Sequence, residues 1–210
     1  MKHHRFLFAG VALGLLAACA ADPEAPAQVA ATETVAAAPS TPEELGPVPM
    51  AYEEPVVGGA KMVVGRDIMA NLSNSKDHTI LVAAIKAAGM DDILRGAGPL
   101  TVFAPTDAAF KRMDGGYQEL MRPENQDQLV RLLSYHVVPE KLDDMTLANR
   151  VMAGNNTASL KTVEGAPLKA TVGDGAAMIV DAKGGFARID VANVLQSNGV
   201  VYVIDKVLIH

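Results

Sequence analysis

The stretch that most restricts the fold lies at the end of the chain, where a turn signal precedes nine mostly apolar residues. Asn198-Gly199 predicts a tight turn, because both residues tolerate positive φ. The residues from Val200 to Leu208 are dominated by Val, Ile and Leu, which is typical of a strand. This run is apolar on both faces near its start. We therefore expect the strand to lie inside a sheet rather than at its edge.

A second informative stretch combines a strand with a helix start. Leu100 to Ala104 has the composition of a short strand and is followed by Pro105. Thr106 can then cap a helix that carries Ala109 and Phe110. The stretch therefore predicts a strand, a turn and a helix in immediate succession.

A Tyr-His pair, Tyr135-His136, lies between these two stretches. In this order and at this spacing, the three stretches resemble the first conserved box, the Tyr-His motif and the second conserved box of the fasciclin (FAS1) domain. The resemblance covers roughly Val56 to His210. It implies a β-sandwich wedge with helices packed along it. The box residues present in this chain are Thr101, Phe103, Pro105, Thr106, Asp107, Phe110, Asn198, Gly199 and Asp205.

The order of elements independently predicts the α+β class, because helical patterns come first and strand patterns follow. The predicted helices are a short one within Arg66–Leu72, one whose apolar face runs from Ile80 to Ala88, one at Met90–Leu94 and one at Pro123–Tyr135. For the second of these, Asp77 or Thr79 is the expected cap and Gly89 the expected stop.

Strand patterns are expected from Leu147 onward. The predicted strands are Ser159–Val163, Leu168–Val172, Ala177–Val180 and Ala187–Val191, separated by glycine-containing turns. Two connecting stretches carry no such pattern. We expect Met113–Arg122 to be a polar loop and Glu140–Asp144 to be an exposed acidic turn.

The N-terminus reads as a targeting segment rather than as part of the fold. Residues 1–18 begin with Lys2 and Arg5 and continue with an apolar run too short to span a bilayer. They end in Leu-Ala-Ala before Cys19, which resembles a bacterial lipobox. The resemblance implies cleavage before Cys19 and lipid attachment there. The alternative is an ordinary signal peptide, cut after Ala18 or Ala20.

Lipidation at Cys19 would make the membrane the first partner of the chain. Two or more acyl chains anchor stably, whereas one is marginal. By resemblance to sorting in Gram-negative bacteria, Ala20 in place of an aspartate favours the outer membrane, an inference restricted to cells with two membranes. The expected location is therefore the cell envelope.

Residues 19–55 have the composition of a disordered linker. They contain seven prolines, seven acidic residues and no Lys or Arg. Few large apolar residues are present to offset the entropy of ordering. We expect a tether that holds the domain, residues 56–210, away from the membrane. The alternative is a spacer without any binding role.

Charge and motif content exclude several classes of function. The formal net charge is −6 and no basic run is present, so we expect no nucleic-acid partner. The histidines show no metal-ligand spacing, and no nucleophile motif occurs. Cys19 is the only cysteine, so the chain has no internal disulfide. The sequence therefore predicts neither an enzyme nor a cofactor or metal site.

The family motifs supply the remaining candidate site residues: Tyr135, His136, Asn198, Gly199 and Asp205. The Tyr-His motif has been linked to adhesion in animal members of the family. The alternative for His136 is a buried structural histidine whose ring nitrogens satisfy backbone groups.

Two positions depart from the animal pattern. Where those domains carry an aspartate proposed to contact integrins, this chain has Asn193, and Tyr202 replaces the usual histidine of the second box. Integrin binding is therefore not expected.

By family resemblance, the predicted function is adhesion or recognition. A lipid-anchored module would bind a protein or glycan through the surface of its FAS1 domain, without catalysis. The alternative is a periplasm-facing binding or carrier protein for an apolar small molecule or an envelope complex.

Overall fold

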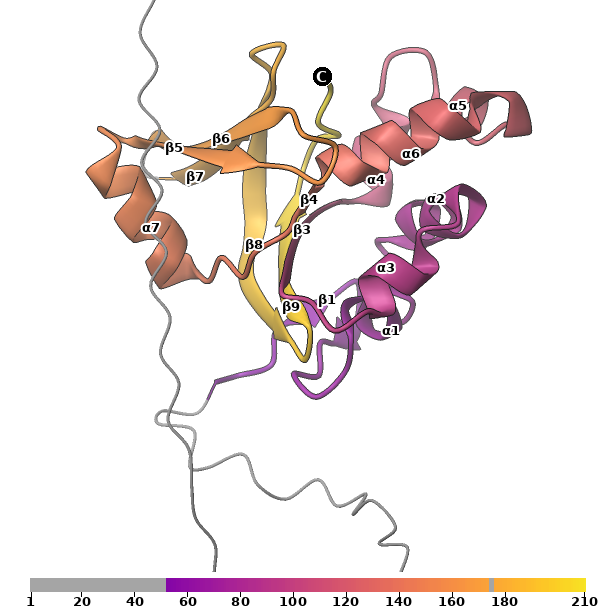
Figure 1. Ribbon diagram of the computed structural model, residues 1–210. Coiled ribbons are helices and arrows are strands. Elements are labelled where there is room, and N and C mark those ends of the chain that lie inside the picture. The colour runs from indigo at the N-terminus through magenta and orange to yellow at the C-terminus, as the bar shows by residue number, and fades with distance from the viewer. Residues whose placement is uncertain (1–51, 174–175) are drawn as a thin grey trace, which may run out of the picture. The chain divides into compact units, whose positions relative to one another are not determined.

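The computed structural model describes residues 52–173 and 176–210. The predicted signal peptide (1–18), Cys19 and the linker as far as residue 51 lie outside the described residues. Within them the α+β class is confirmed, since helices pack beside a seven-stranded sheet that is mostly antiparallel (Figure 1). Side-chain contacts of the domain begin at Tyr52, four positions before the predicted start, because the Tyr52 hydroxyl donates to Asn193 O at 2.8 Å.

The elements have the following bounds. The strands are β1 (Val56–Val57), β2 (Ala60–Lys61), β3 (Leu100–Pro105), β4 (Val137–Val138), β5 (Thr157–Lys161), β6 (Pro167–Gly173), β7 (Ala176–Val180), β8 (Phe186–Gln196) and β9 (Gly199–Ile204). The helices are α1 (Ile68–Leu72), α2 (Thr79–Ala88), α3 (Asp91–Arg95), α4 (Asp107–Lys111), α5 (Tyr117–Leu120), the 3-10 turn η1 (Pro123–Asn125), α6 (Gln126–Tyr135) and α7 (Asp144–Ala153).

The large sheet has the strand order β4-β3-β9-β8-β7-β6-β5. Its β3–β9 pair is parallel and its other pairs are antiparallel. The start of β8 pairs with β7 and the rest of β8 pairs with β9 across two register shifts. Bulges of this kind bend a strand. Because the sheet bends there, β5–β7 run across the direction of β8 and β9 in Figure 1.

The two ends of the sheet approach each other and form the wedge. The amide of Val163, just beyond β5, donates to Val137 O of β4 at 2.8 Å. The space enclosed by the bent sheet is filled by one cluster of buried side chains, which we call the wedge core. It consists of Phe103, Tyr135, Val138, Leu142, Leu147, Val151, Ala158, Leu160, Leu168, Ala170, Ile179, Ala187, Val200, Tyr202, Ile204 and Leu208.

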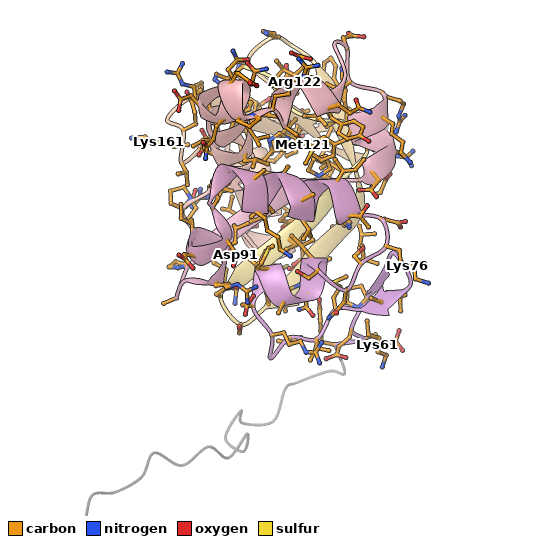
Figure 2. All side chains as sticks on the ribbon, turned by 90° about the vertical axis from the view of Figure 1, so that its right-hand side faces the viewer. Lys61, Lys76, Asp91, Met121, Arg122 and Lys161 are labelled. Carbon is orange, nitrogen blue, oxygen red and sulfur yellow. The ribbon has the colours of Figure 1, made fainter. Side chains whose placement is uncertain are left out.

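The opposite face of β3 and β9 packs against the helices and forms a second cluster, the helix core. It combines buried side chains of α1–α4, and Leu129, Leu132 and Leu133 of α6, with strand residues Leu100, Val102, Ala104, Val201 and Val203. Figure 2 looks onto this helical layer. Of the charged residues labelled there, Lys61 and Lys76 lie at the lower right of the view and Lys161 of β5 lies at its left margin.

Strand β9 is central, as the sequence predicts. It lies between β3 and β8, and all six of its residues are buried. Val200, Tyr202 and Ile204 face the wedge core, while Val201 and Val203 face the helix core. Successive side chains of a strand point to opposite faces, so a strand with a core on each side must be apolar throughout. The strand is shorter than predicted, because it ends at Ile204.

The cap of α2 differs from the prediction. Neither Asp77 nor Thr79 occupies the N-cap, which is His78 and makes no side-chain capping bond. The carboxylate of Asp107 instead accepts hydrogen bonds from the Ile80 amide, at 2.8 Å, and from the Thr79 hydroxyl. At the other end, Gly89 is the predicted stop and adopts φ 69°.

Helix α4 begins as predicted, with Thr106 as its N-cap. The Thr106 hydroxyl oxygen accepts a hydrogen bond from the Ala109 amide at 3.3 Å. The variant Thr106→Ala is expected to lower the free energy of unfolding by about 1 kcal/mol, because this helix-end amide loses its acceptor. Denaturant unfolding measures the change. Thr106→Ser keeps the oxygen and serves as control, so equal losses in both variants would contradict the capping role.

Helix α7 contradicts the prediction of strands from Leu147 onward. It spans Asp144–Ala153, and the first strand after it starts at Thr157. Asp143 is its N-cap and accepts from the Thr146 amide at 2.7 Å. The predicted exposed turn is also wrong at Leu142, which is fully buried in the wedge core. A smaller difference concerns the predicted loop Met113–Arg122, which contains the short helix α5.

Candidate functional site

His136 ends helix α6 and is buried, with 2 % of its surface exposed. Its Nδ1 lies 2.8 Å from Leu132 O, and its Nε2 accepts a hydrogen bond from the Leu208 amide at 3.0 Å. An amide can donate only to an unprotonated ring nitrogen, so Nε2 carries no proton and Nδ1 is the donor. Both ring nitrogens therefore bind backbone groups, and the imidazole is neutral.

The pKa of His136 is strongly lowered, to about 4. Burial is the main cause, since it removes the imidazolium from water. The nearby His210 lowers the pKa further, whereas the carbonyl of Leu132 and the carboxylate of Asp181 raise it. Protonation at Nε2 would also place a proton against the Leu208 amide. This histidine consequently contributes to the fold in its neutral form.

Tyr135 is fully buried in the wedge core, and only its hydroxyl makes polar contacts. The hydroxyl donates to Pro167 O at 3.1 Å and accepts from the Ala182 amide at 2.9 Å. Burial raises the pKa of this phenol. Tyr135 thereby joins α6 to the start of β6 and to the β7–β8 turn, three segments that are distant in sequence.

Asn198 connects the β8–β9 turn to the helices. Its amide nitrogen donates to Leu94 O and to Gly96 O, both at 2.8 Å, and its amide oxygen accepts from the Ile68 amide at 3.0 Å. Three backbone groups of α1, α3 and the segment after α3 are satisfied by one side chain. Few residues other than asparagine offer two donors and an acceptor in so short a side chain.

The physical reason that a glycine is required at position 199 differs from the predicted one. Positive-φ residues of the domain include Gly98 and Asn193, but neither Asn198 nor Gly199. The requirement at Gly199 is space, since a Cβ atom there would lie 2.0 Å from Leu100 O of the neighbouring strand. The parallel pairing of Leu100 with Gly199 therefore demands a residue without a side chain.

Asp205 directly follows β9 and holds the end of this strand in place. Its carboxylate accepts from the Arg188 amide at 2.7 Å, and its own amide donates to Arg188 O at 3.1 Å. Its carbonyl accepts from the Arg112 guanidinium at 2.9 Å. Strands β8 and β9 and the end of α4 are thus held together at this point.

The five motif residues do not converge on one site. The side-chain polar atoms of Tyr135, His136 and Asn198 are bonded within the domain, and Asp205 binds the Arg188 amide through its carboxylate. The five residues are spread over the helix–wedge junction, the β8–β9 turn and the end of β9. An interaction role for any of them stays a prediction, as does lipidation of Cys19, which lies outside the described residues. The geometry leaves the surface of the domain, rather than these buried atoms, for contact with another molecule.

Three concave regions of the surface are candidates for such contact. The largest has a volume of about 430 Å³ and lies between the α4–α6 segment and the C-terminal residues, with Met113, Leu132 and Ile209 in its wall. A second, of about 330 Å³, adjoins it and includes Phe186. The third, of about 220 Å³, lies between α7 and the sheet. The third region cannot be inferred from the sequence pattern, because that pattern does not predict α7.

The chain's departures from the animal pattern lie close to this third region. The Asn193 side chain donates to the Asp144 carboxylate at 3.0 Å, and the Tyr202 hydroxyl donates to Leu142 O at 2.9 Å. The Tyr202 ring stacks on Phe103 with ring centres 5.6 Å apart. Asn193 thus joins β8 to the start of α7, and Tyr202 binds within the wedge core.

Among residues 52–173 and 176–210, no three His, Cys, Asp or Glu side chains gather as metal ligands would. None of the helices in this part of the chain has the length and apolarity needed to cross a bilayer.

These features define the class of protein: an α+β domain with a bent seven-stranded sheet, one core inside the bend and one beneath a layer of helices. The sequence pattern of the fasciclin domain matches residues 76–210. The chain belongs to the fasciclin domain family.

Related proteins agree with this assignment. Protein sll1483 of Synechocystis is 37% identical over 155 residues, which are 73% of this chain and 79% of that protein. The transforming growth factor-beta-induced protein ig-h3 of Sus scrofa is 30% identical over 141 residues, 67% of this chain but 19% of that protein.

The fold is also similar to a solved structure, that of a FAS1 domain pair from the insect cell adhesion molecule fasciclin I. The TM-score is 0.55 at 16% sequence identity, over 69% of this chain and 51% of the other. The fold is therefore shared, and fasciclin domains occur in proteins of cell adhesion.

Proposed function

We propose that this chain is a lipid-anchored recognition module of the cell envelope, whose fasciclin domain binds a protein or glycan through its surface and performs no catalysis. One observation carries the proposal. Both ring nitrogens of His136, and both N–H groups and the oxygen of the Asn198 side chain, are occupied inside the domain. The occurrence of such domains in cell-adhesion proteins supports the same function.

The anchor is proposed at Cys19, on the basis of the Leu-Ala-Ala-Cys sequence that precedes the linker. Two or more acyl chains at this position hold a protein stably on a membrane. Residues 20–51 then provide the distance between the membrane and the domain. Because Ala20 follows the cysteine, the outer membrane is the proposed location.

The anchor is tested by the variant Cys19→Ser in cells that make the full chain. We expect the parent to sediment with membranes and the variant to appear in the soluble fraction, since a serine side chain lacks the thiol that is lipidated. The control is Ser40→Ala, a substitution of a small polar residue in the linker, which should fractionate as the parent does. A Cys19→Ser chain that stays with membranes as the parent does would rule out the anchor.

Recognition itself is tested by attachment. Beads coated with the purified full chain should be retained on cells of the producing organism that lack the chain, whereas beads coated with heat-unfolded chain should not. Equal retention of both kinds of bead would contradict the proposed function.

A second candidate is the inward-facing carrier of an apolar small molecule. It is favoured by the region of about 430 Å³, which falls within the range of about 300–1,000 Å³ of ligand pockets and has Leu120, Leu132 and Ile209 in its wall. Mass spectrometry of the protein purified without denaturant distinguishes the two functions. A carrier retains a molecule that is lost when the protein is denatured, whereas a recognition module shows the same mass before and after denaturation.

A further inference from the structure

A small apolar pocket lies between helix α7 and strands β6, β7 and β8, on the side of the sheet away from α1–α6 (Figure 1). We call it the α7 pocket. Its volume is about 220 Å³. Its floor is formed by the buried side chains of Leu147, Val151, Ala170 and Tyr202. Ala148 and Ala177 are exposed and lie at the mouth of the pocket.

The size of the α7 pocket restricts what it can hold. Pockets for whole ligands measure about 300–1,000 Å³, whereas a cavity of about 150 Å³ lined by apolar side chains accommodates benzene. A volume of about 220 Å³ therefore fits a single aromatic ring with its first substituents. The polar atom of its floor is not free to bind a ligand as a donor, because the Tyr202 hydroxyl donates to Leu142 O.

The surface around the pocket is apolar as well. Met145 and Met152 are 70% and 68% exposed, and Val172 of β6 is 43% exposed. Met145, Ala148 and Met152 are spaced by three and four residues, so they form one row along α7 beside the pocket mouth. Met side chains are flexible and adapt to different contact surfaces.

The exposed apolar residues around the α7 pocket favour a protein over a free small molecule as the occupant. A molecule that fills about 220 Å³ would leave Met145, Met152 and Val172 in water. A protein surface covers such residues while one of its side chains enters the pocket, which is the usual arrangement of an interface anchor and its surrounding contacts. Large aromatic side chains are the most common anchors.

We propose that the α7 pocket receives one aromatic side chain of the protein partner, with Met145, Met152 and Val172 as the surrounding contact surface. This inference rests on the proposed recognition function and names the site and the chemistry of the partner. It also assigns a role to α7 beyond that of covering the wedge core.

The pocket is tested first with N-acetyl-phenylalaninamide, which carries the aromatic side chain alone. Added to the full chain, it should shift the methyl NMR signals of Ala177 and Met178 in a saturable manner, while N-acetyl-serinamide should not. Ala177→Leu places a larger side chain at the mouth and should weaken the affinity at least tenfold. Ala182→Leu, at an exposed alanine outside the pocket, should leave it unchanged.

Unchanged signals, or equal affinity in the parent and in Ala177→Leu, would overturn the proposal. Both variants are exposed substitutions, and their unfolding curves confirm that each is folded before the titration is read.

The partner's use of the pocket is tested by the bead assay. Beads that carry Ala177→Leu should lose most of their retention on cells, as judged against beads that carry Ala182→Leu. Full retention of Ala177→Leu beads would overturn the α7 pocket as the partner's site and leave the recognition function standing. Absence of retention already in the parent would instead contradict the recognition function.

Discussion

Phe103→Ala is expected to lower the free energy of unfolding by about 3–5 kcal/mol, because it leaves a cavity in the wedge core that the surrounding strands cannot close. Phe103 is fully buried in β3, the neighbour of the central strand β9. Its ring stacks on Tyr202 at 5.6 Å, a contact that is lost as well. Chemical denaturation of the full chain at neutral pH measures the loss.

Phe186→Ala is the matched control for this prediction. It removes the same side chain from β8 at a position that is 59% exposed. Little apolar surface is returned to water there, so its effect should stay within about 1 kcal/mol. Similar losses in the two variants would mean that Phe103 does not occupy the interior of the wedge.

Acidification is expected to destabilise the domain through His136. Its pKa is about 4 in the folded chain and about 6.5 when unfolded, so the unfolded chain binds more protons between these values. The stability contributed by the neutral ring is complete above pH 6.5 and declines as the pH falls towards 4. Between pH 7 and pH 4.5 the loss should amount to about 2–3 kcal/mol.

The variant His136→Phe isolates this contribution. It is expected to be less stable than the parent at pH 7, because Leu208 N and Leu132 O lose their partner, but to show a smaller decline on acidification. His78, also buried and with a lowered pKa, accounts for part of the remaining decline. His210→Gln removes the neighbouring ring that lowers the pKa of His136, so it should reduce the decline slightly, and by less than His136→Phe does. An unaltered slope in His136→Phe would show that this ring is not held neutral.

The parts of the fold that the sequence predicts are those in which the local pattern and the tertiary environment agree. Strands β3 and β9 are apolar on both faces because a core lies on each side. Helix α2 shows its buried face at Leu81, Ala84, Ile85 and Ala88, and it stops at Gly89. Burial on both faces of a strand and the periodicity of a helix can both be recognised in a single sequence.

The sequence pattern does not predict helix α7 because the buried side of this helix is small. Only Leu147 and Val151 are buried, and its other large apolar residues, Met145 and Met152, face outward. The terminal signals were present nevertheless, since Asp143 precedes the helix and Gly154 follows it. Without α7 the pocket beside it could not be inferred.

Contacts between distant segments account for the other differences. Asp107 caps α2 from a position 27 residues away, and no local sequence pattern indicates so distant a partner. Gly199 is required by the carbonyl of Leu100, which is 99 positions earlier in the chain, rather than by the dihedral angles of its own turn. The family resemblance supplied the identity of these positions, and the structure supplies their physical reason.

Protease treatment of intact cells that make the full chain tests recognition at the cell surface. The domain is detected with an antibody before and after treatment, and a periplasmic protein serves as the marker of an intact envelope. A surface recognition module predicts that the domain disappears while the marker survives. Survival of the domain until the outer envelope is opened would contradict that function and would place the domain among inward-facing carriers.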